Sequence, residues 1–137
     1  MGKEESKETV RSFIRLLNSR ELSRLGEVCN DSMVYRLNNQ MGAPDLESYK
    51  SLIQGSQDAF PDLEFVIEEL LAEDNKVHMI YRLTGTHEGD YMGIKASQNK
   101  VDVVVSAVVT IENGKLAEQK EFHGTFSFMK QVDAVPG

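Results

Sequence analysis

The chain has 137 residues, 40% of them hydrophobic, which predicts a single compact domain over residues 1–137 with loosely held ends at 1–8 and 133–137. Its 22 acidic and 15 basic side chains give a formal net charge of −7 without a basic cluster, which argues against nucleic acid as a partner. The sequence has no apolar run of the roughly 18 residues that a membrane span needs, and its single cysteine, Cys29, excludes an intrachain disulfide framework and favours the cytoplasm.

Helical periodicity dominates the first 60 residues. Apolar residues at helical spacing predict an amphipathic helix from about Lys3 to Ser19: Val10, Phe13, Ile14 and Leu17. A shorter helical turn follows, and then a short strand at 33–37. Asp45 is a good N-cap for a third helix, which Pro61 ends.

From Leu63 onward the apolar period changes from helical to two. Four long strands are predicted over 63–72, 76–86, 100–112 and 115 to about 128. The dipeptide Asn113-Gly114 favours a two-residue hairpin between the last two. Helices followed by a meander of strands predict an α+β domain with a curved antiparallel sheet.

Four short motifs together carry a family resemblance. They are Ala59-Phe60-Pro61-Asp62-Leu63, Gly85-Thr86-His87-Glu88-Gly89 with Gly93-Ile94, Asn113-Gly114-Lys115-Leu116 and Lys130-Gln131-Val132. In order and spacing they resemble the SnoaL-like polyketide cyclases from about Val10 to Val132. The resemblance implies the cone-shaped fold of ketosteroid isomerase and nuclear transport factor 2, in which the curved sheet wraps around the N-terminal helix and two further helices complete the domain.

The family chemistry that this resemblance implies is cofactor-free acid and base catalysis of an intramolecular aldol closure. A carboxylate in an apolar cavity suits that chemistry, because desolvation raises its pKa. The sequence departs from the family pattern at three positions. Arg36 stands where relatives often have histidine, Ala107 where many carry an acid, and Gly124 where the catalytic aspartate lies. We therefore expect a pocket without the family's usual catalytic acid.

Strand alternation predicts which side chains line that pocket. If no bulge intervenes, one face of the second long strand carries Val77, Met79, Tyr81, Leu83 and His87. In the last strand one face carries Leu116, Glu118, Lys120, Phe122, Gly124 and Phe126, and the opposite face carries Gln119, Glu121, His123 and Thr125. The resemblance places the set that contains Glu118 and Gly124 inside the cone.

Three residues are candidates for catalysis: His87, Glu118 and Tyr81. His87 and Glu118 are possible acids or bases, and Tyr81 could donate a hydrogen bond to a substrate carbonyl. We expect the pocket to be lined by Tyr35, Arg36, Met79, Tyr91, Lys120, Phe122 and Gly124. Each candidate also has a structural interpretation: His87 as part of a loop, Glu118 with Lys120 as a partly solvated ion pair, and the tyrosines as core.

Neither a metal site nor a cofactor is predicted, because the three histidines lack ligand spacing and no glycine-rich phosphate loop is present. Three functions stay open: a cofactor-free cyclase or isomerase acting on a small apolar carbonyl compound, a non-catalytic pocket for a small apolar ligand, and a dimerisation or interaction module. Residues 101–109 are apolar on both strand faces, which predicts a homodimer that buries the outer face of the sheet.

Overall fold

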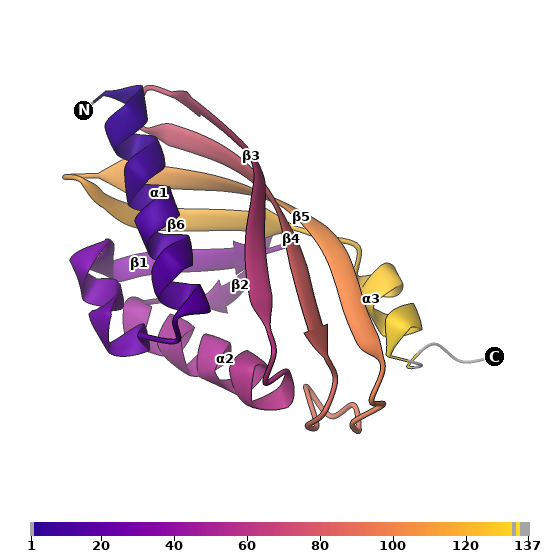
Figure 1. The fold of residues 1–137 in the computed structure, drawn as a ribbon. Helices are drawn as coiled ribbons and strands as arrows, with labels where there is room; N and C mark the ends of the chain where they lie inside the picture. Colours follow the sequence, from indigo (N-terminus) through magenta and orange to yellow (C-terminus); the bar gives the residue numbers. More distant parts are fainter. Residues whose placement is uncertain (1, 133, 135–137) are drawn as a thin grey trace.

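The structure of the protein is a computed structural model that describes residues 2–132 and 134. Its elements are α1 (Lys3–Asn18), η1 (Leu22–Glu27), β1 (Cys29–Leu37), β2 (Gln40–Ala43), α2 (Leu46–Ala59), β3 (Glu64–Glu73), β4 (Lys76–Thr86), β5 (Lys100–Glu112), β6 (Lys115–Phe122) and α3 (Thr125–Gln131). Figure 1 shows a curved sheet with α1 lying across it, α2 beside it and α3 near the start of β5. The predicted α+β class, with a sheet that curves around the N-terminal helix, is confirmed.

The six strands lie in the order β2-β1-β6-β5-β4-β3. Neighbouring strands pair antiparallel, as predicted, except that β1 and β6 are parallel. These two strands are far apart in the sequence, so no hairpin turn fixes their relative direction. The sheet is therefore mixed, with one parallel pair near the edge that β2 forms.

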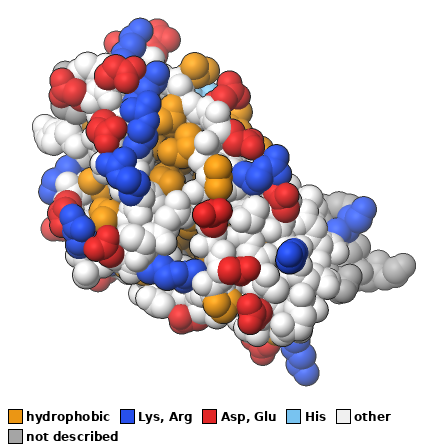
Figure 2. Space-filling model, in the orientation of Figure 1, with side chains coloured by type: hydrophobic (Ala, Val, Ile, Leu, Met, Phe, Trp, Pro, Cys, Tyr) orange, Lys and Arg blue, Asp and Glu red, His pale blue; other side chains and the backbone are white. Residues whose placement is uncertain are grey.

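Helix α1 buries its apolar stripe against the concave side of the sheet. Val10 and Phe13 are fully buried, while the opposite face carries ion pairs such as Glu8 with Arg15 at 2.9 Å. Figure 2 shows acidic and basic side chains mixed along this helix. Residues 3–8, which the sequence suggested are loosely held, form the first turns of α1, and of residues 133–137 the structure describes Ala134 alone.

Helix α2 begins as its cap residue predicts. The carboxylate of Asp45 accepts a hydrogen bond from the backbone N–H of Ser48 at 2.8 Å, which satisfies one of the free donors of the first turn. The helix ends before Phe60, and its buried face includes Tyr49 and Ile53. Both residues therefore point toward the interior of the cone.

Strand β6 contains a bulge that changes which of its side chains face inward. Leu116 pairs with Ile111 of β5, and Glu118 pairs with the residue before it, Thr110. Ala117 is therefore an extra residue in β6. Beyond the bulge, Gln119 and Glu121 are buried and Lys120 is exposed. The predicted assignment of faces in this strand is therefore wrong from Glu118 onward, because it assumed uninterrupted alternation.

The last predicted strand is also too long. Strand β6 ends at Phe122, and Gly124 is the N-cap residue of α3, a helix that the sequence did not predict. The ring of Phe128 on α3 packs 6.3 Å from that of Phe60 and 6.0 Å from that of Tyr91, between ring centroids. Phe128, which the apolar pattern assigned to the end of a strand, thus packs α3 against the cone.

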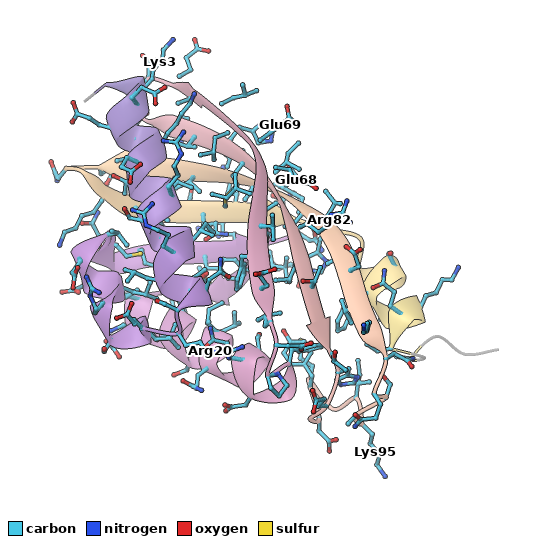
Figure 3. The ribbon with its side chains drawn as sticks, in the orientation of Figure 1. Lys3, Arg20, Glu68, Glu69, Arg82 and Lys95 are labelled. Atoms are coloured by element: carbon cyan, nitrogen blue, oxygen red, sulfur yellow. The ribbon has the colours of Figure 1, made fainter. Side chains whose placement is uncertain are left out.

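The outer face of the sheet is partly charged. Arg82 on β4 pairs with Glu68 on β3 at 3.1 Å and with Asp102 on β5 at 2.6 Å, and Figure 3 labels Glu68 and Arg82 on these neighbouring strands. Apolar side chains lie on the same face, since Val104 pairs with Arg82 in the sheet and is 49% exposed.

Candidate functional site

A cavity of about 560 Å³ occupies the cone between the sheet, α2, α3 and the segment that joins β4 to β5. This volume lies within the range of roughly 300–1,000 Å³ that small-molecule sites occupy. Most of its lining is apolar or aromatic: Tyr35, Leu37, Met41, Tyr49, Leu52, Ile53, Phe60, Leu63, Phe65, Tyr81, Leu83, Tyr91, Met92, Ile94, Val101, Val103, Val105, Phe128 and Met129. The remaining lining residues are Gln40, Gly42, Ser56, Glu121 and His123.

Glu121 supplies the carboxylate of this cavity. Its side chain is only 7% exposed, and it accepts hydrogen bonds from the hydroxyl groups of Tyr35 on β1 and Tyr81 on β4. The amide of Gln119 donates a third, weaker bond at 3.3 Å. Three strands thus converge on one carboxylate, and because the two phenols occupy different oxygens of the group, its orientation is fixed.

Burial raises the pKa of Glu121 above the ordinary value for glutamate. The hydrogen bonds from Tyr35 and Tyr81 and the nearby His123 act in the opposite direction but do not cancel the effect of burial. Burial, with the charge of Glu121 as a further cause, raises the phenolic pKa values of Tyr35 and Tyr81. Both phenols therefore stay protonated and act as hydrogen-bond donors.

His123 lies two residues beyond Glu121 and also lines the cavity. Its Nδ1 atom is buried and has no hydrogen-bond partner in the part of the chain that the structure describes, while its backbone N–H donates to the side chain of Asn38 at 3.2 Å. The cavity thus offers a carboxylate and an imidazole to one bound molecule.

Gly42 explains how Tyr35 reaches Glu121. A methyl group at this glycine would lie 2.5 Å from Cδ2 of Tyr35, so only glycine lets β2 pass so closely over the ring. The ring of Tyr49 on α2 packs 5.3 Å from that of Tyr35, between centroids. Tyr35 is therefore held between a strand and a helix, with its hydroxyl on Glu121.

His87, predicted as an acid or base, is fully buried and is not among the lining residues. Its Nδ1 accepts a hydrogen bond from the backbone N–H of Ser97 at 3.2 Å, and its ring stacks on Phe60 at 5.2 Å. Its Nε2 is buried without a partner among the described residues. In this arrangement His87 ties together the two ends of the segment between β4 and β5.

The structure separates the other predicted residues into two groups. Tyr35, Tyr81 and Tyr91 line the cavity. The rest do not: Arg36, Met79, Glu118, Lys120, Phe122 and Gly124.

The bulge and the core account for the residues that lie outside the cavity. Glu118 forms an ion pair with Arg36 at 3.3 Å between Nε and Oε2, and Phe122 is 41% exposed. Met79 is fully buried in the core. Placement of Glu118 and Lys120 inside the cone was wrong because each follows the extra residue Ala117.

Sequence reasoning missed Glu121, His123 and Tyr49 as residues of the cavity. One energetic signal favoured the correct face, since burying Gln119 and Glu121 brings in one ionisable group, whereas burying Glu118 and Lys120 brings in two. The sequence pattern contains no other indication of the bulge at Ala117.

Other chemistry finds less support in the described residues, 2–132 and 134. Within them no three His, Cys, Asp or Glu side chains are grouped as a metal ion would require, and no helix is long and apolar enough to cross a membrane. Burial raises the pKa of the Cys29 thiol to about 12, which leaves it a poor nucleophile.

Comparisons with known proteins agree with this fold. The sequence matches the family model for SnoaL-like polyketide cyclases over residues 7–132. No curated protein matches it.

Solved structures resemble the chain over nearly its whole length. A proposed SnoaL-like polyketide cyclase of Jannaschia sp. CCS1 has a TM-score of 0.88 at 22% identity. The match covers 98% of this chain and 95% of that protein's chain. AclR of Streptomyces galilaeus, a proposed hydroxylase, has a TM-score of 0.86 at 20% identity, with coverages of 98% and 100%. TsrD of Streptomyces laurentii has a TM-score of 0.87 at 19% identity, with coverages of 98% and 99%. At these identities the likeness shows the fold alone.

Proposed function

Because this chain belongs to the SnoaL-like polyketide cyclase family, we propose that it is a cofactor-free cyclase or isomerase in which Glu121 exchanges protons with an apolar carbonyl compound. The observation that carries the proposal is the buried carboxylate of Glu121 in an apolar cavity, held by Tyr35 and Tyr81. In this proposal Glu121, near the end of β6, takes the role of the acid that is absent at Gly124, the N-cap residue of α3.

The chemistry needs one base and one proton donor. In its ionised form Glu121 removes a proton from the carbon next to a substrate carbonyl, and the electron pair of that C–H bond passes into an enolate. In a cyclisation, the enolate carbon forms a bond to a second carbonyl carbon of the same molecule as its C=O π bond breaks, and the alkoxide that results takes back the proton from the carboxylic acid of Glu121. In an isomerisation, the proton returns to a different carbon.

Two features of the cavity favour this reaction. A raised pKa makes the carboxylate of Glu121 a stronger base than an exposed glutamate, and the apolar lining excludes water that would compete for the proton. His123 lies within the same cavity and can donate a hydrogen bond to the oxygen on which negative charge develops. Tyr35 and Tyr81 orient the carboxylate, so they are positioning residues.

Exchange of the α-hydrogens of 2-tetralone for deuterium, followed by NMR in D₂O, tests the first step without knowledge of the natural substrate. The unaltered chain should accelerate exchange over buffer, and Glu121→Gln should reduce that acceleration by about 10²- to 10⁴-fold, the usual contribution of a general base. Glu118→Gln, which removes the same charge from the other face of β6, is the matched control and should leave the rate unchanged. Exchange at the buffer rate, or exchange that survives Glu121→Gln, contradicts the proposal.

A non-catalytic ligand-binding protein is the second candidate function. Glu121 already accepts hydrogen bonds from three neutral donors, which favours this candidate. Such an arrangement fixes a carboxylate in place whether or not it takes part in catalysis. Ligand binding without proton exchange, for any of a series of enolisable ketones, would support this candidate.

We also propose a homodimer that buries the outer face of the sheet. Val104 on β5 and Phe122 on β6 are 49% and 41% exposed, and between them the outer face carries Ser106, which pairs with Phe122. Light scattering at micromolar concentration should give twice the chain mass of 15.4 kDa. A monomer mass contradicts the proposal, and Val104→Lys should shift a dimer toward monomer, because it brings a charge into the interface.

A further inference from the structure

The charges of the cavity are strongly unequal. Among the described residues that line it, Glu121 is the one carboxylate, and none is a lysine or an arginine. Arg36 and Lys120 adjoin the lining residues Tyr35 and Glu121 in the sequence, on the strands β1 and β6, but lie outside the lining. Among the described lining residues, the remaining side chain with a basic nitrogen is that of His123.

The hydrogen-bond partners of Glu121 do not supply an opposite charge. Tyr35, Tyr81 and Gln119 are neutral donors, so they satisfy the oxygen atoms without supplying an opposite charge. An ionised carboxylate that is buried without a positive partner is unfavourable. A ligand that brings a positive charge into the cavity therefore gains more from Glu121 than a neutral ligand of the same shape.

The aromatic lining favours the same kind of ligand. Four tyrosines and three phenylalanines line the cavity: Tyr35, Tyr49, Tyr81, Tyr91, Phe60, Phe65 and Phe128. Two ring pairs include the residues that hold Glu121, Tyr35 with Tyr49 at 5.3 Å and Tyr81 with Phe65 at 5.7 Å between centroids. Aromatic rings attract cations through their quadrupole, and protein sites for substituted ammonium groups use this combination.

We propose that the cavity binds a flat, largely apolar ligand that carries a protonated nitrogen, with that nitrogen paired to Glu121 and the apolar part against the aromatic side chains. This inference rests on the cavity used in the proposed function but not on catalysis. A cation on Glu121 occupies the base, so such a ligand also inhibits proton exchange.

Three fused-ring probes of closely similar shape separate charge from size. Near neutral pH, 9-aminoacridine is a cation, acridine is neutral and acridine-9-carboxylate is an anion. Titration calorimetry with the full chain should give the tightest binding for 9-aminoacridine, by about 10- to 100-fold over acridine, which is the usual effect of a hydrogen bond to a charged group. The carboxylate should bind most weakly.

Two variants locate the effect. Glu121→Gln should bring 9-aminoacridine to the affinity of acridine while leaving acridine itself nearly unchanged, and Glu118→Gln should keep the full preference for the cation. Glu118→Gln also controls for attraction to the net negative charge of the chain. Circular dichroism checks that both variants fold. If Glu121→Gln does not fold, the affinities of the three probes for the unaltered chain test the preference for a cation.

Several results overturn the inference: equal affinity for 9-aminoacridine and acridine, tighter binding of the anion, a cation preference that survives Glu121→Gln, or no binding of any probe. The outcome is separable from that of the proposed function. Failure of ketone exchange with an intact cation preference removes the catalytic proposal alone, and exchange without a cation preference removes this inference alone.

Discussion

Glu118 and Glu121 lie three residues apart on the same strand, and their surroundings have little in common. Glu118 is partly exposed and pairs with the guanidinium of Arg36, whereas Glu121 is buried among phenols at the wall of a cavity. Strand alternation places them on opposite faces, and the extra residue Ala117 decides that the face with Glu121, rather than the face with Glu118, points into the cone. The chemistry open to a carboxylate thus depends on the local strand geometry as much as on the residue type.

Reversal of charge should separate the two glutamates most strongly. Glu121→Lys places an ammonium group without a carboxylate partner in an apolar cavity and should lower the free energy of unfolding by about 3–5 kcal/mol. Glu118→Lys, beside solvent, should lower it by no more than about 1 kcal/mol. Urea denaturation of the two variants measures the difference, and equal losses would show that Glu121 is not held in the interior.

Dependence of stability on pH should sharpen the contrast. The pKa of Glu121 is higher in the folded protein than its ordinary value, so between these two values the folded state holds a proton that the unfolded state has lost. Its contribution to stability is therefore fully present below the ordinary pKa and is lost as pH rises through the folded pKa. The unaltered chain and Glu118→Gln should share this loss.

The Glu121→Gln variant should not lose stability in this pH range, because glutamine does not titrate. Denaturant melts of the three proteins at a series of pH values provide the measurement. Parallel curves for all three would mean that the pKa of Glu121 does not change on folding.

A smaller effect concerns how Glu121 is held. Gly42→Ala puts a methyl group against the ring of Tyr35 and should cost about 1–3 kcal/mol of stability, because the ring or β2 must move. It should also lower ketone exchange, since Tyr35 orients the carboxylate.

Gly55→Ala is the matched control for this substitution. Gly55 lies inside α2 with no atom within 4 Å of the added carbon, so alanine there should stabilise the protein by about 0.5–1 kcal/mol. Thermal melts of both variants check the opposite signs. A neutral Gly42→Ala variant would show that β2 is not tightly packed on Tyr35.

Local signals in the sequence predicted much of the fold. The cap at Asp45, the hairpin at Asn113-Gly114 and the helical stripe around Phe13 each depend on a few neighbouring residues, and all three occur in the structure. The parallel pairing of β1 with β6 and the bulge at Ala117 depend on strands that meet only in the folded chain. No short pattern encodes them.

The candidate site was less predictable for the same reason. Tyr35, Tyr81 and Tyr91 were expected at the cavity and line it, and all three lie outside β6, the strand that contains the bulge at Ala117. Glu121 and His123 were assigned to the wrong face, since a single unpaired residue reverses every side chain beyond it. The carboxylate that the fold buries, that of Glu121, therefore lies three residues before Gly124, the position at which the resemblance places the catalytic acid.

The tyrosines of the cavity have one further consequence. The sequence contains four tyrosines and no tryptophan, and all four tyrosines line the cavity. The tyrosine fluorescence of the protein therefore originates at this one place. Any molecule that enters the cone changes the emission of the entire chain, so the protein carries its own optical reporter and needs no label.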